Sequence, residues 1–239
     1  MNSIIEWLKW DSSFFGFKTG RIIITSSYQI DAQLIQSEMQ LNGFQLVYCF
    51  IDPQNTKANN VVKKMGGNLV DEKVTFYKEI ETNSFFVNNN ISVYKDLTLT
   101  TELYQLSLQS GVHSRFKIDN KFPNGTFEAF YKTWIENSIL DQQADICFVY
   151  KTLEKITGFI TLKTDATSGH IGLIAVDQKL RGLNIGTQMI KACECELASK
   201  NINQLRVVTQ KANINAMQFY NKNNFKVENI VNVYHLWKD

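Results

Sequence analysis

Cysteine is scarce in this sequence, with four residues among 239. The spacing of Cys49, Cys147, Cys193 and Cys195 matches no zinc-binding pattern. Cys193 and Cys195 are two positions apart in a predicted helix, so their side chains point to different sides of it. We therefore expect reduced thiols and no bound metal.

Long runs of one kind of residue are also missing. The net charge is only +2, from 25 basic and 23 acidic side chains, and no basic run stands out. This argues against a nucleic-acid partner held through phosphate contacts. No apolar run approaches the roughly 18 residues of a membrane span, and Glu6, Lys9 and Asp11 interrupt the N-terminal apolar residues in a way that a signal peptide does not. We expect a cytoplasmic protein without membrane insertion.

Apolar residues are plentiful, at 44% of the chain, which is enough for a packed interior. Helix and strand patterns alternate along the sequence, which indicates an α/β (α+β) protein with mixed sheets flanked by helices. The polar segment 81–90 is typical of a linker. We therefore predict two lobes, residues 1–84 and residues 91–239.

The periodicity of apolar residues predicts the elements of each lobe. The first lobe is expected to contain strands at about 21–25, 45–52 and 74–80, and helices at about 31–41, with Asp31 as N-cap, and 55–65. For the second lobe we predict strands at about 91–94, 146–150, 156–163, 170–176, 204–210 and 226–237, and helices at about 101–110, 127–139, 186–198 and 214–221.

The N-terminal segment is dense in aromatic residues, which is typical of a core. Phe14 and Phe15 are adjacent, so in an extended segment their side chains face opposite ways. One of the two could then line a ligand cleft instead of the core.

The last quarter of the chain resembles part of the first third. Asn55 and Ala58 open one predicted helix, and Asn213 and Ala216, both 158 residues further on, open another. The same strand, helix, turn and strand surround both pairs. We infer that the first lobe is a truncated copy of the second that has lost its chemistry.

The stretch from His170 to Ala198 predicts a phosphate-binding loop. An apolar strand at 171–176 leads through RGLNIG, residues 181–186, into a helix. Unpaired backbone N–H groups and the helix dipole meet at such a helix start and bind phosphate oxygens. The glycines at 182 and 186 fit neither the GxxxxGK[ST] loop of P-loop proteins nor the GxGxxG loop of dinucleotide-binding proteins. The alternative is a surface turn that binds nothing.

RGLNIG resembles motif A of the GNAT acyltransferases, R/Q-x-x-G-x-G/A, whose loop holds the diphosphate of coenzyme A. The resemblance implies that the chain binds acyl-CoA. Asn184 replaces a glycine of that motif, and asparagine tolerates left-handed backbone angles better than other side chains do. The cofactor-binding residues implied by the resemblance are Ala175, Val176, Arg181, Gly182, Leu183, Asn184, Ile185, Gly186, Thr187, Asn213 and Tyr220.

NINAMQFYNKNNF, residues 213–225, resembles GNAT motif B, N-x-x-A-x-x-L-Y-x-x-x-G-F, with Asn224 in place of its glycine. In that family, an amine attacks a thioester and expels a thiolate. A phenol with a pKa near 10 is acidic enough to protonate the leaving sulfur. We predict Tyr220 as this general acid, the alternative being a tyrosine that only packs in the helix.

The resemblance also implies a backbone N–H donor for the thioester oxygen at Val176 or its neighbours Ala175 and Asp177. Asn213 is expected to contact the pantetheine arm. The sequence does not identify a base for the attacking amine. His113, His170 and Asp177 are candidates, and the proton can also pass to water.

WDSSFFGF at 10–17, HSRFKIDNKF at 113–122 and YKTWIENSI at 131–139 look like signatures of the two-lobed GNAT enzymes that acylate dTDP-linked amino sugars. The implied small-molecule substrates are acyl-CoA and a dTDP-amino sugar. Arg115 suits a phosphate, Ser114 a hydroxyl or phosphate oxygen, and aromatic rings suit thymine. The residues expected to bind this substrate are Phe14, Phe15, His113, Ser114, Arg115 and Phe116.

Two other interpretations stay open at this point. The chain could be a GNAT enzyme that acylates a protein N-terminus, a lysine or a small amine. The two asparagines in place of glycine also allow a non-catalytic coenzyme A module. The sequence leaves the oligomeric state open, a homodimer included, and it does not say whether the acyl group is acetyl or longer.

Overall fold

The computed structural model describes residues 4–25, 30–81, 86 and 88–238. The chain forms two compact units. The first consists of Met1–Val74, Gln210–Ala212 and Asn229–Asp239, and the second of Thr75–Thr209 and Asn213–Glu228. The predicted linker lies partly outside the described residues, and the C-terminal segment belongs to the first unit.

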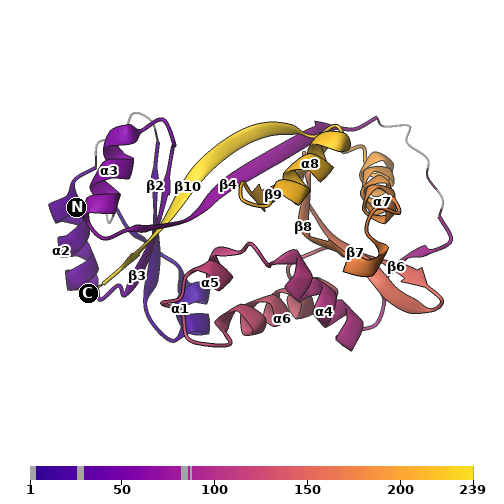
Figure 1. The fold of residues 1–239 in the computed structure, drawn as a ribbon, viewed down its shortest axis with the longest axis horizontal. Coiled ribbons are helices and arrows are strands. Elements are labelled where there is room, and N and C mark those ends of the chain that lie inside the picture. The colour runs from indigo at the N-terminus through magenta and orange to yellow at the C-terminus, as the bar shows by residue number, and fades with distance from the viewer. Residues whose placement is uncertain (1–3, 26–29, 82–85, 87, 239) are drawn as a thin grey trace. The chain divides into compact units, whose positions relative to one another are not determined.

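The first unit is a sheet flanked by helices (Figure 1). Its strands follow the order β1-β2-β3-β10-β4, with β2 parallel to β3 and β10 antiparallel to β3. The elements are β1 (Glu6–Trp7), α1 (Lys9–Phe15), β2 (Thr19–Ile24), α2 (Ala32–Asn42), β3 (Leu46–Ile51), α3 (Thr56–Lys64) and parts of β4 (Asn68–Glu79) and β10 (Lys226–Trp237). Asp31 caps α2 as predicted, accepting hydrogen bonds from the backbone N–H groups of Gln33 and Leu34.

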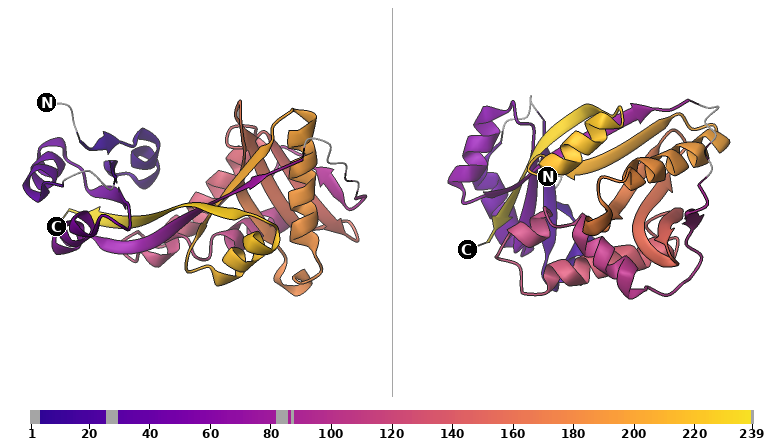
Figure 2. Two further views of the ribbon diagram at one scale, coloured as in Figure 1. Left: turned by 90° about the horizontal axis from the view of Figure 1, so that it is seen from above. Right: turned by 45° about the vertical axis from the view of Figure 1, so that its right-hand side comes forward.

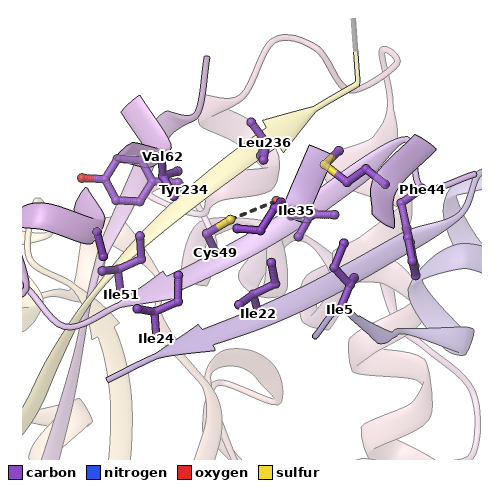
Figure 3. Packing of buried hydrophobic residues seen from close by; sticks show 13 residues of the cluster. Ile5, Ile22, Ile24, Ile35, Phe44, Cys49, Ile51, Val62, Tyr234 and Leu236 are labelled. Carbon is purple, nitrogen blue, oxygen red and sulfur yellow. Dashed lines mark hydrogen bonds between the residues drawn. The ribbon is translucent and has the colours of Figure 1, made fainter. Parts of the chain in front are cut away.

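The core of the first unit lies between these strands and the helices α2 and α3. Figure 3 shows Ile22 and Ile24 of β2, Cys49 of β3 and Ile35 of α2 pointing into one cluster. Tyr234 and Leu236 of β10 join this cluster and are 0% and 3% exposed. The C-terminal strand is therefore part of the core of the first unit.

The second unit contains a long antiparallel meander, β5 to β8, followed by a parallel strand, β9. The strand order is β4-β9-β8-β7-β6-β5. The elements are the rest of β4 and β10 with β5 (Ile91–Val93), α4 (Thr101–Ser110), α5 (Arg115–Ile118), α6 (Thr126–Ile139), β6 (Ile146–Thr152), β7 (Lys155–Thr164), β8 (Gly169–Val176), η1 (Gln178–Leu180), α7 (Ile185–Ser199), β9 (Gln204–Gln210) and α8 (Ile214–Lys222). The strands and helices predicted from periodicity for this part of the chain are confirmed.

Helices cover both faces of this second sheet (Figure 2). On one face, α4 and α6 pack through Leu103, Tyr131 and Ile135 against Phe159 of β7 and residues of β8. On the other face, α7 approaches so closely that a Cβ at Gly169 of β8 would lie 2.5 Å from a methyl carbon of Leu197. Alternation along the strands therefore sends neighbouring residues to different helices.

The predicted internal repeat agrees with the bounds of the elements. A shift of 158 residues places α3 on α8, and β4 on β10, at both ends. Asn55 and Asn213 have nearly the same backbone angles (φ −79°, ψ 72° and φ −83°, ψ 73°), and each accepts a hydrogen bond from the N–H of the alanine three positions on, at 3.0 and 3.2 Å. Gly66 and Asn224, which correspond under the shift, both have positive φ, at 88° and 64°.

The two copies exchange their last strands. In the first unit β3 lies between β2 and β10, and in the second β9 lies between β8 and β4. Under the shift of 158 residues, β4 corresponds to β10. The orders β2-β3-β10 and β8-β9-β4 are therefore equivalent, but the last strand of each copy pairs with strands of the other copy. This equivalent order supports the repeat.

Three short elements differ from or add to the sequence prediction. The segment with Phe14 and Phe15 is the helix α1 and not an extended chain, so the expected alternation of these two side chains is wrong. The helix has no buried residue, and Trp10 is 45% exposed. The strand β1 and the one-turn helix α5 were not predicted, because both are too short to show a periodic pattern.

Candidate functional site

Strands β8 and β9 pair only over the first residues of β8 and then separate. The later residues of β8 therefore form an open edge, meaning an edge without a neighbouring strand. Their parallel pairing covers Gly169, His170 and Ile171 of β8, whereas β8 continues to Val176. In the first unit, the corresponding strands β2 and β3 pair along the whole of Thr19–Ile24. Residues 172–176 of β8 therefore lie beside β7 on one side and have no β9 partner on the other.

The separation begins at a β-bulge. The register between β7 and β8 shifts between Ile160 and Leu162, so that Gly172 and Leu173 both lie opposite Thr161. The Leu173 N–H donates a hydrogen bond to the Thr161 hydroxyl at 2.8 Å. A glycine inside a strand weakens it and often marks such a bulge.

Strand alternation tells which backbone groups lie at the open edge. The Asp177 N–H donates to the carbonyl of Thr157 on β7 at 2.8 Å, and Val176 and Ala175 lie opposite Gly158 and Phe159. In an antiparallel ladder every second residue turns its N–H to the partner strand. The N–H groups of Ala175 and Asp177 therefore point to β7, and those of Ile174 and Val176 point to the open edge.

The loop after β8 carries two residues with left-handed backbone. Gly182 has φ 85°, and Asn184 has φ 62° and ψ 12°. Asparagine thus keeps the backbone conformation for which glycine is the usual residue, as expected from the sequence. The Arg181 Nε donates to the Val176 carbonyl at 3.2 Å, which ties the loop to the end of β8.

The start of α7 has no side-chain cap. Asn184 is the N-cap residue, and its side chain makes no capping hydrogen bond. The first N–H groups of the helix, at Ile185, Gly186 and Thr187, are consequently available at the positive end of the helix dipole. Leu183, in the predicted loop, is 63% exposed.

Motifs A and B meet at Gly186. A Cβ at this position would lie 2.9 Å from Cζ of Phe219, so only glycine allows α7 and α8 to approach this closely. The neighbouring Tyr220 is 4% exposed, and its ring packs against Phe76, Phe219 and Phe225 with centroid distances of 5.5, 5.4 and 5.6 Å. Burial raises the pKa of its phenol above the ordinary value of 10.

The three predicted base candidates have different surroundings. The His170 Nε2 lies 2.8 Å from Oδ2 of Asp165, and both side chains are well exposed. Hydrogen bonds from the Thr167 backbone and from His170 hold the pKa of Asp165 well below its usual range. Asp177 caps η1 by accepting from the Lys179 N–H, and His113 is half-buried just before α5.

The residues predicted to bind the acceptor fall in both units. In the second unit, Ser114 is the N-cap of α5, and the Arg115 guanidinium lies 4.6 Å from the centroid of the Phe116 ring. Phe116 is 7% exposed and packs against Phe122 and Phe130. This packing leaves the ring of Phe116 little surface for a nucleobase.

Phe14 and Phe15 belong to the first unit. The Phe14 ring stacks on Trp10 with a centroid distance of 5.1 Å and meets Phe15 edge-on at the same distance. Both phenylalanines are half-buried. They form an aromatic surface together with Trp10.

The structure adds residues that the sequence did not identify. Ile174 places an N–H at the open edge, and Thr161 and Gly172 form the bulge. The indole Nε1 of Trp134 on α6 lies 3.8 Å from the position of a Cβ at Gly172. The one available signal in the sequence was Gly172 itself, a glycine within an apolar strand.

The cysteines, all of which lie in the described residues, are four free thiols. Cys193 is buried, and Cys195 is partly exposed. Burial raises the pKa of Cys49 and of Cys147 to about 12. Within the described ranges, no three His, Cys, Asp or Glu side chains gather in a way that suits a metal ion, and no helix has the length and apolar character to cross a membrane.

The sequence of this chain matches a known protein family. The family model described as the acetyltransferase (GNAT) domain covers residues 116–232, which contain the bulge, the loop and both motifs. Residues 116–232 are thus similar to the GNAT acetyltransferase domain, and the chain is an acyl-CoA-dependent N-acyltransferase.

One curated protein and several solved structures are similar to this chain along most of its length. The chain is 26% identical over 226 residues to the dTDP-fucosamine acetyltransferase of Escherichia coli O6:H1, a match that covers 94% of each chain. A functionally unknown conserved protein from Staphylococcus epidermidis has a similar fold, with a TM-score of 0.61 at 9% identity over 98% of this chain and 91% of that one. A tandem GNAT protein from the clavulanic acid biosynthesis pathway gives a TM-score of 0.55 at 11% identity, covering 92% and 75%. The two-lobed GNAT fold predicted from the sequence is confirmed.

Proposed function

We propose that this protein transfers an acyl group, acetyl or a short hydroxyacyl such as 3-hydroxybutyryl, from coenzyme A to the amino group of a dTDP-linked amino-dideoxy sugar used for surface polysaccharide. The observation that carries the proposal is the similarity to a dTDP-fucosamine acetyltransferase along 94% of both chains. The acceptor signatures around residues 10–17 and 113–139 add to it. The cytoplasm is the proposed location, since free thiols in the described residues suit a reducing compartment.

In this proposal the loop and the open edge hold acyl-CoA. The N–H groups of Ile185, Gly186 and Thr187 donate to the diphosphate at the positive end of α7. Arg181 adds a guanidinium beside the same anion. The pantetheine arm lies along residues 172–176 and takes the place of β9, so its amides bond to the free backbone groups of β8.

The chemistry follows from the groups at this edge. The neutral amine attacks the thioester carbon, and the N–H of Ile174 or Val176 stabilises the negative charge on its oxygen. Collapse of the intermediate breaks the carbon–sulfur bond, and Tyr220 gives its phenol proton to the departing thiolate. The proton lost from the amine passes to solvent, either directly or through His170, and returns from solvent to Tyr220.

Residues of α5 and α6 are proposed to hold the acceptor. The Arg115 guanidinium suits the diphosphate of the sugar nucleotide. Trp134, next to the bulge, offers an aromatic face and an N–H to the sugar. Phe14 and Phe15 stay predicted contacts for the thymine ring.

The proposal is tested by products and by selective kinetics. The protein is incubated with acetyl-CoA and a panel of dTDP-amino sugars that carry the amine on C3 or C4, with the free amino sugars and a lysine peptide as comparison acceptors. Mass spectrometry is expected to find acyl transfer to a dTDP-linked sugar only. Transfer to the peptide or equally to the free sugars would contradict the proposal.

Charge reversal at Arg115 gives a second test. Arg115→Glu is expected to raise KM for the sugar nucleotide by at least about tenfold, because a charge-assisted contact to phosphate becomes a repulsion, while KM for acyl-CoA stays constant. Lys117→Glu is the matched control, since Lys117 is exposed in the same short helix. Equal effects of the two variants would remove Arg115 from the site.

A further inference from the structure

We propose that Thr161 is a positioning residue for acyl-CoA, because its hydroxyl holds the bulge that separates β8 from β9. The inference rests on the proposed coenzyme A site at this edge and extends it to a residue that does not touch the substrate. Thr161 is 1% exposed and lies on β7, one strand away from the open edge.

At the bulge, one backbone N–H of β8 does not take part in the regular hydrogen bonding between β7 and β8. Gly172 and Leu173 share a single partner position on β7, so the Leu173 N–H has lost a regular carbonyl acceptor. Leu173 is 4% exposed and water does not replace that acceptor easily. The Thr161 hydroxyl accepts this hydrogen bond at 2.8 Å.

The position of the bulge coincides with the end of the β8–β9 pairing. Ile171 is the last β8 residue in register with β9, and the bulge begins at the next residue. The corresponding strands of the first unit, β2 and β3, can be compared with β8 and β9. They pair continuously over Thr19–Ile24. Strand β8, which carries the bulge, leaves β9 after three paired residues, whereas β2 stays paired with β3 along all six of its residues.

The bulge also decides which N–H groups face the open edge. Because side chains and N–H groups alternate along a strand, a shift of one residue in register turns every backbone group to the other side. Without the bulge, the N–H groups of Ile174 and Val176 would point to β7 instead of the cofactor. The Thr161 hydroxyl therefore stabilises the register that the proposed chemistry requires.

Binding measurements separate this role from a general effect on stability. The two ligands are coenzyme A and adenosine 3′-phosphate 5′-diphosphate, which has the diphosphate but lacks the pantetheine arm. Thr161→Val keeps the shape of the side chain and removes the acceptor. We expect it to weaken coenzyme A binding by about tenfold and to leave the affinity for the nucleotide unchanged, since the loop at residues 181–187 is not altered.

Two further variants complete the test. Thr161→Ser retains the hydroxyl and is expected to restore coenzyme A affinity to within about twofold of the wild type. Thr19→Val is the control, because Thr19 is a buried threonine of the first unit whose hydroxyl bonds the Phe17 carbonyl. It is expected to leave both affinities unchanged even if it lowers the melting temperature.

Gly172→Ala addresses the bulge from the other strand and covers the case in which Thr161→Val does not fold. Its Cβ would lie 3.0 Å from the Thr161 hydroxyl oxygen, which must then move. We expect the same selective loss of coenzyme A affinity. Equal loss for both ligands, or wild-type affinity in Thr161→Val or Gly172→Ala, would overturn the proposal. These binding measurements contain no acceptor sugar. Their result therefore does not depend on whether the proposed dTDP-amino sugar is the true acceptor.

Discussion

Replacement of Tyr220 by phenylalanine separates the chemical role of the phenol from its packing. The ring is buried among Phe76, Phe219 and Phe225, and a phenylalanine at this position would keep those contacts. The free energy of unfolding is therefore expected to change by no more than about 0.5 kcal/mol, which is a shift of roughly 1–2 °C in melting temperature for a chain of this size.

The effect on turnover is expected to be much larger. A positioned general acid contributes about 10²–10⁴ in rate, so kcat of Tyr220→Phe should fall by this factor, equivalent to roughly 3–5 kcal/mol of activation free energy. The affinity for coenzyme A should remain, since the loop and the open edge of β8 are not changed.

The pH dependence gives an independent check. Burial raises the pKa of Tyr220 above its ordinary value of 10, so the phenol keeps the proton that it must donate. The wild-type kcat should therefore show no descending limb from this group below about pH 10. A rise of rate with pH from deprotonation of the substrate amine is expected in both proteins.

The assay follows the coenzyme A thiol released at saturating acceptor, with calorimetry for coenzyme A binding. Tyr150→Phe is a matched control, because the hydroxyl of Tyr150 on β6 accepts a hydrogen bond from Asn90, away from the motifs. A Tyr220→Phe enzyme with wild-type kcat would refute the acid role. A loss of turnover explained by weaker coenzyme A binding would refute it as well.

Two predictions concern the loop. Asn184→Gly is expected to keep the affinity for coenzyme A. Asn184→Val should lower this affinity at least about tenfold, because a β-branched side chain is strained by about 1–2 kcal/mol at φ 62°. Calorimetry that finds equal affinity in both variants would contradict the need for this backbone conformation. Gly186→Val should reduce both coenzyme A affinity and kcat, since its Cβ would lie 2.9 Å from Phe219. The double variant with Phe219→Ala should recover part of the affinity, and strictly additive losses would show that the contact is unimportant.

Local structure followed closely from the sequence where periodicity was strong. The helix at 101–110 and the strands at 204–210 and 226–237 have the predicted bounds, because each combines a regular apolar pattern with polar residues at its ends. The segment at 9–15 was expected to be extended but is a helix. Its aromatic residues are so close together that they show neither a helical nor a strand period. Its N-cap position is Leu8, which carries no capping signal.

The site was predictable only in part. RGLNIG and the Asn213–Ala216 cap are local patterns, so their backbone conformations could be expected from neighbouring residues. The open edge depends on Thr161 and Leu173, which are 12 residues apart and meet only through the pairing of two strands. For the same reason the family resemblance gave Val176 or its neighbours Ala175 and Asp177 as the donor, while the register favours Val176 and adds Ile174.

The exchange of β4 and β10 has a consequence for biosynthesis. Strand β3 is synthesised before the second unit, whereas its antiparallel neighbour, Asn232–Trp237, is synthesised after that unit. Until then the edge of β3 is bare, and Asn59 of α3 lacks the Asn232 and Tyr234 side chains that donate to it at 2.8 Å. The nascent first unit is thus exposed to aggregation and to chaperones for the whole time that the ribosome needs to synthesise the second unit.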